Sequence, residues 1–270
     1  MTGESSNGEE LLRRLNTAVP HPARVYDVWL GGKDNYPADR AAAAAGLEAF
    51  PSTIQSVRAN RAFLARAVEY LAAEEGIRQF LDIGTGLPSA NNTHEVAQAT
   101  AEESRVVYVD NDPVVMLHAQ ALLTSTAPGV TDYIEADLRE TDTILSAAAR
   151  TLDFSKPVAI LLLAVLHFIP DEDDPYTIVR KLMDEVPSGS FLVIVHAPSD
   201  RSPEEMAEQT RRYNESGAEL MSPRSQEEIL RFFTGLELVG PGVAPLSEWL
   251  PAGQAGPASG EAVAGVGRKP

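Results

Sequence analysis

The sequence predicts an α/β fold, a doubly wound and mostly parallel sheet of seven strands preceded by an N-terminal helical cap. From Arg78 onward, short runs rich in apolar and β-branched residues alternate with helical patterns, which is the signature of repeated βα units. The run Val158–Leu166 is continuously apolar, as in a central strand covered on both faces. Three successive expected strands also end in aspartate, which favours a ligand site at one edge of the sheet.

Length and patterning favour one domain over residues 1–270. Residues 1–75 would form the helical cap, and residues 76–270 the sheet core with a polar helical insertion near 198–233. The longest apolar run is too short to cross a bilayer, and the polar, acidic first residues lack a basic signal region. We therefore expect a cytoplasmic protein with no membrane partner.

Charge and composition exclude several classes of function. A net charge of −17 and a pI near 4.7 disfavour an extended phosphate-binding surface, so nucleic acid is not an expected partner. The chain contains no cysteine, which excludes disulfides, thiolate metal sites and a cysteine nucleophile.

The N-terminal part is expected to be helical after a short lead-in. Residues 1–20 carry no strong period, and the prolines around His21 interrupt any helix there. The stretch from Arg24 to Tyr36 mixes aromatic residues, charges and a glycine pair, which indicates a folded cap. Residues 41–45 favour helix, and a helix over 60–71 would pack an apolar face on the sheet.

The βα units follow in order. Strands are expected near 78–83, 105–110, 131–136, 157–165 and 189–196, and helices near 93–101, 113–123, 141–151 and 174–185. Beyond Pro198, helices are expected over 202–218 and 225–233, and the last two strands over 236–239 and 261–267, with an antiparallel direction as one alternative. The Gly-, Ala- and Pro-rich residues 253–260 favour a hairpin loop between those two strands.

The stretch Asp82-Ile83-Gly84-Thr85-Gly86 ends the first strand and is typical of a nucleotide-cofactor cradle. The two glycines allow a sharp turn and a close approach of the backbone to a ligand, and Asp110 at the end of the next strand can accept both hydroxyls of a ribose. A carboxylate at position 82 suits S-adenosylmethionine, which carries a sulfonium and an ammonium, better than it suits a pyrophosphate. Asp112 competes for the ribose role, but Pro113 follows it, so an N-cap role fits it better.

A family resemblance is carried by longer motifs, listed here by their ranges: 24–36, 60–61, 80–88, 107–114, 164–169 and 237–243. These stretches resemble a mainly actinobacterial S-adenosyl methyltransferase family, formerly filed as a domain of unknown function, within the class I methyltransferases. The resemblance covers nearly the whole chain. It implies a Rossmann-like methyltransferase sheet and S-adenosylmethionine as the cofactor, with S-adenosylhomocysteine as its product.

The resemblance also implies roles for individual residues. Asp82 would lie near the methionine amino group, Gly84, Thr85 and Gly86 under the cofactor, Asp110 and Asn111 at the ribose, Asp137 and Leu138 beside the adenine, and Ala164 and Val165 along the methionine side. Pro88 replaces the usual third glycine, so the loop to Thr93 is expected to be longer than usual.

Several residues of the cap are candidates for closing over the cofactor or binding the acceptor, namely Arg24, Tyr26, Asp27, Lys33, Asn35 and Tyr36. An alternative is that this segment is structural, with Trp29 and Leu30 in the core. Arg58 and Arg61 share a helix face, and one of them, with Arg61 preferred, could hold the cofactor carboxylate.

Histidines and acidic residues provide the candidates for chemistry. His167 follows the central strand, where a neutral imidazole could take a proton from the acceptor; a structural histidine is the alternative, and His196 is a weaker candidate. The acids at 171–174 are expected in a solvated loop, with a helix beginning at Pro175. His21, His94 and His118 lack paired ligands at metal spacing, so no metal is expected.

The sequence therefore predicts in-line methyl transfer to a small-molecule acceptor, with the polar helix over 202–218, including Arg211, Arg212 and Tyr213, as a possible lid. Two alternatives stay open. One is a protein that binds S-adenosylmethionine without transferring methyl, and the other is a nicotinamide-dependent oxidoreductase, since Gly84–Ser89 nearly matches that cofactor's fingerprint. An apolar-walled cavity beside His167 and Tyr26 would favour the enzyme. The oligomeric state is left open.

Overall fold

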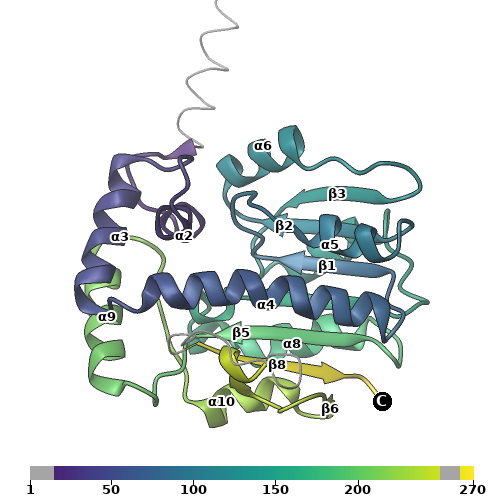
Figure 1. Ribbon diagram of the computed structural model, residues 1–270. Coiled ribbons are helices and arrows are strands. Elements are labelled where there is room, and N and C mark those ends of the chain that lie inside the picture. Colours follow the sequence, from purple (N-terminus) through teal and green to yellow (C-terminus); the bar gives the residue numbers. More distant parts are fainter. Residues whose placement is uncertain (1–14, 250–261) are drawn as a thin grey trace, which may run out of the picture.

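The computed structural model describes residues 15–249 and 262–270, which form a mixed sheet with helices on both faces (Figure 1). The path through the sheet runs β3-β2-β1-β4-β5-β8-β6, and the short β7 pairs separately with β8. Strands β1 to β5 are parallel and β8 runs antiparallel to β5. The doubly wound fold expected from the sequence is confirmed.

The strands lie where the apolar patterns indicate: β2 has the expected bounds, β3 is shifted by one residue, and the other predicted strands are shorter than expected. Their bounds are β1 Gln79–Ile83, β2 Arg105–Asp110, β3 Val130–Glu135, β4 Ala159–Leu163, β5 Phe191–His196, β6 Glu237–Leu238, β7 Ala244–Pro245 and β8 Val263–Arg268. β7 was not predicted, because two residues carry no periodicity that a sequence pattern can detect. The expected hairpin loop at 253–260 lies outside the described residues.

Helices cover both faces of the sheet. Their bounds after β1 are α5 Thr93–Thr100, α6 Pro113–Leu122, α7 Thr141–Ala148, α8 Pro175–Asp184, α9 Pro203–Glu215 and α10 Gln226–Leu230. One core cluster joins α4, α5 and α6 to side chains such as Phe80 and Val106, and the other joins α7 and α8 to Leu81 and Val107. Alternate strand residues thus pack on opposite faces, as a two-sided parallel sheet requires.

The cap combines two parts of the chain that are far apart in sequence. Helices α2 (Pro22–Leu30), α3 (Pro37–Ala49) and α4 (Thr53–Ala73) precede the sheet, and α9 comes from the insertion after β5. α3 lies against α9 (Figure 1), and Val25, Ala42, Ala43 and Tyr213 form an apolar cluster between them. The expected packing of α4 on the sheet is confirmed. No helix in the described ranges is both long and apolar enough to cross a membrane.

Two stretches contain 3₁₀ turns that the sequence patterns did not specify. The acids at 171–174 are exposed, as expected, and three of them form the turn η2 (Asp171–Asp173). Asp171 pairs with the buried Arg224 at 2.7 Å, and Asp173 pairs with Arg139 at 2.6 Å. The expected helix over 225–233 is α10 followed by another 3₁₀ turn, η3 (Arg231–Phe233). Ion pairs and packing between residues distant in sequence, which no local pattern records, stabilise both turns.

The glycines of β8 allow η3 to approach the sheet, and this generates a stability prediction. A Cβ built on Gly265 would lie 2.6 Å from Cζ of Phe233. Gly265→Ala should therefore lower the free energy of unfolding by about 1–3 kcal/mol, as overpacking does. Urea denaturation of Gly265→Ala, Phe233→Leu and the double variant measures the coupling. The explanation requires a smaller effect of the alanine in the Phe233→Leu background, so simple additivity would contradict it.

Candidate functional site

A cavity of about 190 Å³ lies at the carboxyl ends of β1, β2, β4 and β5, beneath the cap. One water molecule needs only about 15 Å³, so the cavity can hold a ligand of many atoms. The sheet order reverses between β1 and β4, and ligands of open α/β sheets bind at such switch points. The lining includes these residues named from the sequence: Tyr26, Arg61, Asp82, Gly84, Thr85, Gly86, Asp110, Asn111, Ala164, Val165 and His167.

The turn after β1 brings the backbone close to the cavity. Gly84 and Gly86 have φ of +75° and +68°, values that side-chain-bearing residues rarely adopt. A Cβ on Gly84 would lie 2.6 Å from Cβ of Val165, whereas a Cβ on Gly86 would meet nothing within 4 Å. Gly84 is therefore required by packing, and Gly86 leaves open space beside its backbone. α5 begins only at Thr93, so the loop is as long as Pro88 suggested.

Asp110 ends β2 and organises this turn. Its Oδ2 accepts a hydrogen bond from the Gly86 amide at 2.8 Å, and its Oδ1 accepts one from the Asp112 amide at 3.0 Å. Burial raises the pKa of Asp110, although His21 and these two amides oppose the rise. Each carboxylate oxygen has a further lone pair, so Asp110 can still accept hydroxyl groups from a ligand. Asp112 caps α6 through Val114, as predicted.

Asp82 is buried, and the Thr93 hydroxyl donates to its Oδ2 at 2.6 Å. Desolvation raises the pKa of Asp82 to about 6, opposed by the Thr93 hydrogen bond and by the positive charge of Arg61. A carboxylate with so little compensation is stabilised by a cation that enters the cavity.

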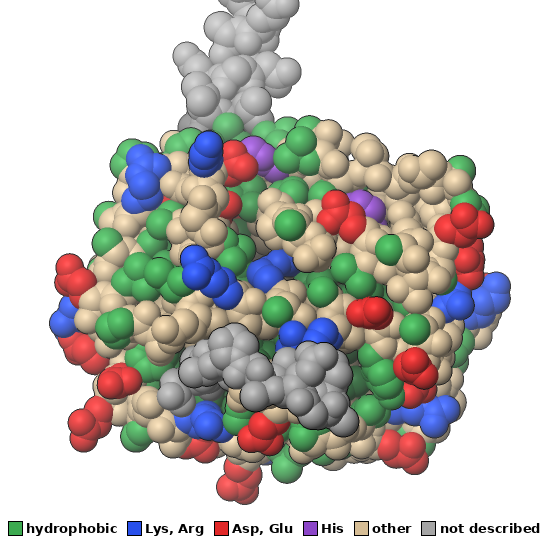
Figure 2. Space-filling model, viewed as in Figure 1, with side chains coloured by type: hydrophobic (Ala, Val, Ile, Leu, Met, Phe, Trp, Pro, Cys, Tyr) green, Lys and Arg blue, Asp and Glu red, His purple; other side chains and the backbone are tan. Residues whose placement is uncertain are grey.

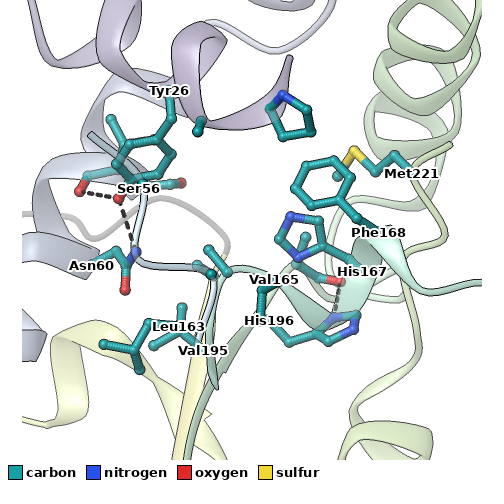
Figure 3. Close-up of a pocket in the computed structure, with 18 of the residues that line it drawn as sticks. Tyr26, Ser56, Asn60, Leu163, Val165, His167, Phe168, Val195, His196 and Met221 are labelled. Carbon is teal, nitrogen blue, oxygen red and sulfur yellow. Dashed lines mark hydrogen bonds between the residues drawn. The ribbon is translucent and has the colours of Figure 1, made fainter. Parts of the chain in front are cut away.

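Asn60 of α4 and Tyr26 of α2 both line the cavity and are joined by a hydrogen bond. Asn60 donates to Tyr26 Oη at 2.8 Å, and Tyr26 in turn donates to the Val57 carbonyl at 3.0 Å (Figure 3). Asn60 Oδ1 is buried and has no partner among the described residues. Burial raises the pKa of Tyr26 to about 12, so its hydroxyl stays protonated.

Arg61 ties α4 to the loop after Gly86. Its Nη2 donates to the carbonyls of Ala90 and Asn91, both at 3.1 Å, while its buried Nε has no partner among the described residues. Arg58 is exposed and does not line the cavity, so only one of the two arginines reaches it. Figure 2 shows basic side chains over α4 near the middle of this face and acidic ones mostly around its margin.

A smaller cavity adjoins the first and contains the remaining strand-end acid. Asp137 and Leu138 line it together with Asp110 and Asn111. Asn111 Nδ2 donates to Asp137 at 3.2 Å, and Arg139 pairs with Asp137 at 2.8 Å. The three strand-end carboxylates thus lie around two connected cavities, although Asp137 follows β3 by two residues rather than ending it.

His167 lies in the 3₁₀ turn η1 (Leu166–Phe168) that follows β4. Ala164, just before it, has φ of +62°, an uncommon value for alanine. His167 Nδ1 is buried without a partner in the described ranges. Burial lowers the pKa of His167 well below its usual range, as do the neighbouring His196 and Arg224, so the ring is neutral.

Arg224 supports this turn from behind. It is buried and donates to the carbonyls of Leu166 and Ile169 at 2.9 and 2.7 Å. His196 accepts a weak contact from Arg224 Nη1 at 3.4 Å through Nε2 and donates from Nδ1 to the Ala197 carbonyl at 2.9 Å (Figure 3). Both ring nitrogens of His196 therefore have protein partners. His167 lines the cavity, and its Nδ1 has no partner among the described residues.

Most of the N-terminal motif builds the cap instead of lining the cavity. Of its six candidates only Tyr26 lines it. Asp27 accepts from the Asp34 amide and from Asn35 Nδ2, and Arg24 pairs with Asp112 at 3.0 Å. The density of this motif therefore reflects the hydrogen bonds that build the loop and an ion pair between the cap and the N-cap of α6.

Several lining residues were not named as ligand groups from the sequence: Asn60, Phe168, Met206, Gln209, Glu219 and Met221. Glu219 lines both cavities, and burial raises its pKa. Only the docking of α9 and its following loop onto the cap brings the last four there, so no local signal could identify them. Among the described residues, no group of three potential metal ligands occurs.

Comparison with known proteins places this site in a family. A profile described as S-adenosyl methyltransferase (Methyltransf_19) matches residues 8–270. A DUF574 family protein from Streptomyces avermitilis is 44% identical, with a TM-score of 0.91 over 95% of this chain and 100% of that one. A putative methyltransferase from Thermobifida fusca is 39% identical, with a TM-score of 0.87 over 94% and 97% of the two chains. No curated protein sequence matches.

A more distant structure shares the fold alone. The plantazolicin methyltransferase BpumL, solved with S-adenosylhomocysteine, is 12% identical, with a TM-score of 0.56 over 97% of this chain and 99% of that one. The family resemblance expected from the motifs is confirmed by the profile match and by the two close structures. The chain belongs to the S-adenosyl methyltransferase family, whose cofactor is S-adenosylmethionine.

Proposed function

We propose that the cavity under the cap transfers a methyl group in line from S-adenosylmethionine to a small-molecule acceptor. One observation carries the proposal, the grouping of three kinds of ligand-binding feature around one cavity. These are the buried carboxylates of Asp82 and Asp110, the positive-φ glycines Gly84 and Gly86, and the atoms Asn60 Oδ1 and Arg61 Nε, which have no partner among the described residues. Family membership decides between the cofactor classes and leaves the nicotinamide alternative without support.

The donor set fits the charges of the cofactor. Asp82 and the open Asn60 Oδ1 would accept hydrogen bonds from its ammonium, and Arg61 would hold its carboxylate. Asp110 would accept the ribose hydroxyls, and the smaller cavity beside Asn111 and Asp137 would take the adenine.

The bound cofactor supplies a sulfonium-activated methyl group, so the protein mainly has to position the acceptor and exclude water. The cap helices supply that enclosure. His167 would take the acceptor proton at its open Nδ1. The apolar-walled space beside His167 and Tyr26 favours an enzyme over a protein that only binds the cofactor.

The raised pKa of Asp82 makes its role testable through pH. Because the pKa in the folded protein, about 6, exceeds the ordinary 3.8, the buried charge opposes folding above pH 6, and the opposition fades as the pH falls toward 3.8. Asp82→Asn should therefore make the ligand-free protein more stable at pH 7.5, by up to about 3 kcal/mol, and not at pH 4. Chemical denaturation at both pH values measures this; equal stabilities at pH 7.5 would contradict it.

The same variant, Asp82→Asn, should bind the cofactor more weakly. The ammonium favours the ionised form of Asp82, so wild-type affinity should fall as the pH is lowered from 7.5 to 5.5. Asp82→Asn should bind S-adenosylmethionine at least about tenfold more weakly at pH 7.5 and should lack most of that pH dependence. Calorimetric titration measures both. An unchanged affinity in the variant would remove Asp82 from the site.

Asp110 provides the test of the activity itself. Asp110→Asn should weaken S-adenosylmethionine binding about tenfold or more, because a charged acceptor of two hydroxyl bonds is lost. Asp142→Asn, which changes the same charge at a side chain 89% exposed, is the matched control. Methyl-tritiated cofactor incubated with a total cell extract, which is then separated by size, should yield labelled small molecules with the wild type and the control only. Labelled protein or nucleic acid in place of small molecules would refute the acceptor class.

A further inference from the structure

Four Asp, Glu, Lys or Arg side chains of the described residues line the larger cavity: Arg61, Asp82, Asp110 and Glu219. The part of the lining toward α2 and α9, here called the cap half, is formed mainly by Trp29, Phe50, Phe168, Met206, Tyr213 and Met221. The charge nearest to it is the carboxylate of Glu219, which acts on Tyr213. Among the described residues, the α2, α9 and 3₁₀-turn side chains that line the cap half include no Lys, Arg, Asp or Glu.

The polar groups of the cap half mostly bond to one another. Trp29 Nε1 donates to the Ala43 carbonyl at 3.1 Å, and Gln209 Nε2 donates to Thr53 Oγ1 at 2.8 Å. These bonds leave aromatic and thioether surfaces toward the cavity, including the rings of Phe168 and Tyr213, whose centroids are 5.9 Å apart. Such surfaces favour a flat apolar ligand.

Two polar atoms of this side remain open. Tyr213 Oη and His167 Nδ1 are both buried without a partner in the part of the chain that the structure describes. Burial, with the negative charges of Glu219 and Asp39, raises the pKa of the Tyr213 hydroxyl, so it is a hydrogen-bond donor at neutral pH, whereas His167 is a neutral acceptor. Figure 3 shows His167 beside Phe168 and Met221, facing the wall that carries Tyr26 and Asn60.

We infer that the methyl acceptor is an uncharged aromatic alcohol, with a phenolic hydroxyl as the nucleophile; this inference rests on the proposed methyl transfer. A carboxylated or phosphorylated acceptor would bury an anion in the cap half without a cation there to pair with it. An alkylamine arrives protonated at neutral pH, so its nitrogen has no lone pair free to attack the methyl carbon. A phenol arrives uncharged, because its ordinary pKa is about 10.

The acceptor, the cofactor and His167 account for all the bonds and charges that change in the transfer. The phenolic oxygen forms a bond to the methyl carbon, and the carbon–sulfur bond breaks with its electron pair left on sulfur. The phenolic proton passes to Nδ1 of His167 and then to solvent. The positive charge lost from sulfur thus reappears on the imidazole, so the net charge of the cavity is unchanged during the step.

The test compares three probes of one shape on the protein saturated with S-adenosylhomocysteine. These are 2-naphthol, its carboxylated analogue 6-hydroxy-2-naphthoate, and the cationic 2-naphthylmethylamine. Calorimetry should show 2-naphthol binding at least about tenfold more tightly than either charged probe, equivalent to about 1.4 kcal/mol. Methylation of 2-naphthol from S-adenosylmethionine would extend the support. No binding of 2-naphthol, or equal or tighter binding of a charged probe, overturns the inference.

A charge placed in the cap half should reverse the preference. Met221 is only partly buried, so Met221→Lys can be accommodated, and it should tighten 6-hydroxy-2-naphthoate binding at least about fivefold without tightening 2-naphthol. Leu220→Lys, at a neighbouring side chain that is 59% exposed, adds the same charge outside the cavity and should change neither affinity. A parallel titration with S-adenosylmethionine separates the proposed methyl transfer from the inferred acceptor class. If the protein does not bind S-adenosylmethionine, the proposed function is wrong. If it binds S-adenosylmethionine but prefers a charged probe to 2-naphthol, only the acceptor class is wrong.

Discussion

The burial of carboxylates at the carboxyl edge of a parallel sheet is the constraint on which this structure depends. Asp82 and Asp110 are both almost fully buried, yet nearby arginine and backbone donors compensate their charges only in part. The turn at Gly84 and Gly86 directs an amide to Asp110, and Thr93 at the start of α5 directs a hydroxyl to Asp82. In the proposed function, a cationic, hydroxyl-bearing cofactor would supply the remaining compensation.

The cap makes that edge a closed site. Its helices come from both sides of the sheet core in sequence, and the apolar cluster of Val25, Ala42, Ala43 and Tyr213 holds them together. Arg24 links the cap to Asp112, the N-cap of α6, two residues beyond Asp110. The helices proposed to enclose the acceptor are therefore anchored close to the strand end proposed to hold the cofactor.

Much of the fold could be predicted because it depends on local patterns. The continuous apolar run of β4 and the proline-started α6 and α8 lie close to their expected positions. The misses have tertiary causes. The acids of η2 are exposed as expected, but their pairing with Arg224 and Arg139 was not foreseen because these partners are distant in sequence, and β7 exists only because β8 pairs with it.

The sequence by itself determined the sheet, the glycine turn and the strand-end acids, because strand periodicity, positive φ and the chain direction of parallel strands are local properties. The family followed from contiguous motifs. Only the tertiary structure decided which polar groups lack a partner: within residues 15–249 and 262–270, Asn60 and His167 keep unpartnered atoms, whereas His196 is satisfied through Ala197 and Arg224. It also decided that the cap half carries aromatic and thioether side chains, because α9 reaches the cavity by packing against α3, a contact between residues more than a hundred positions apart.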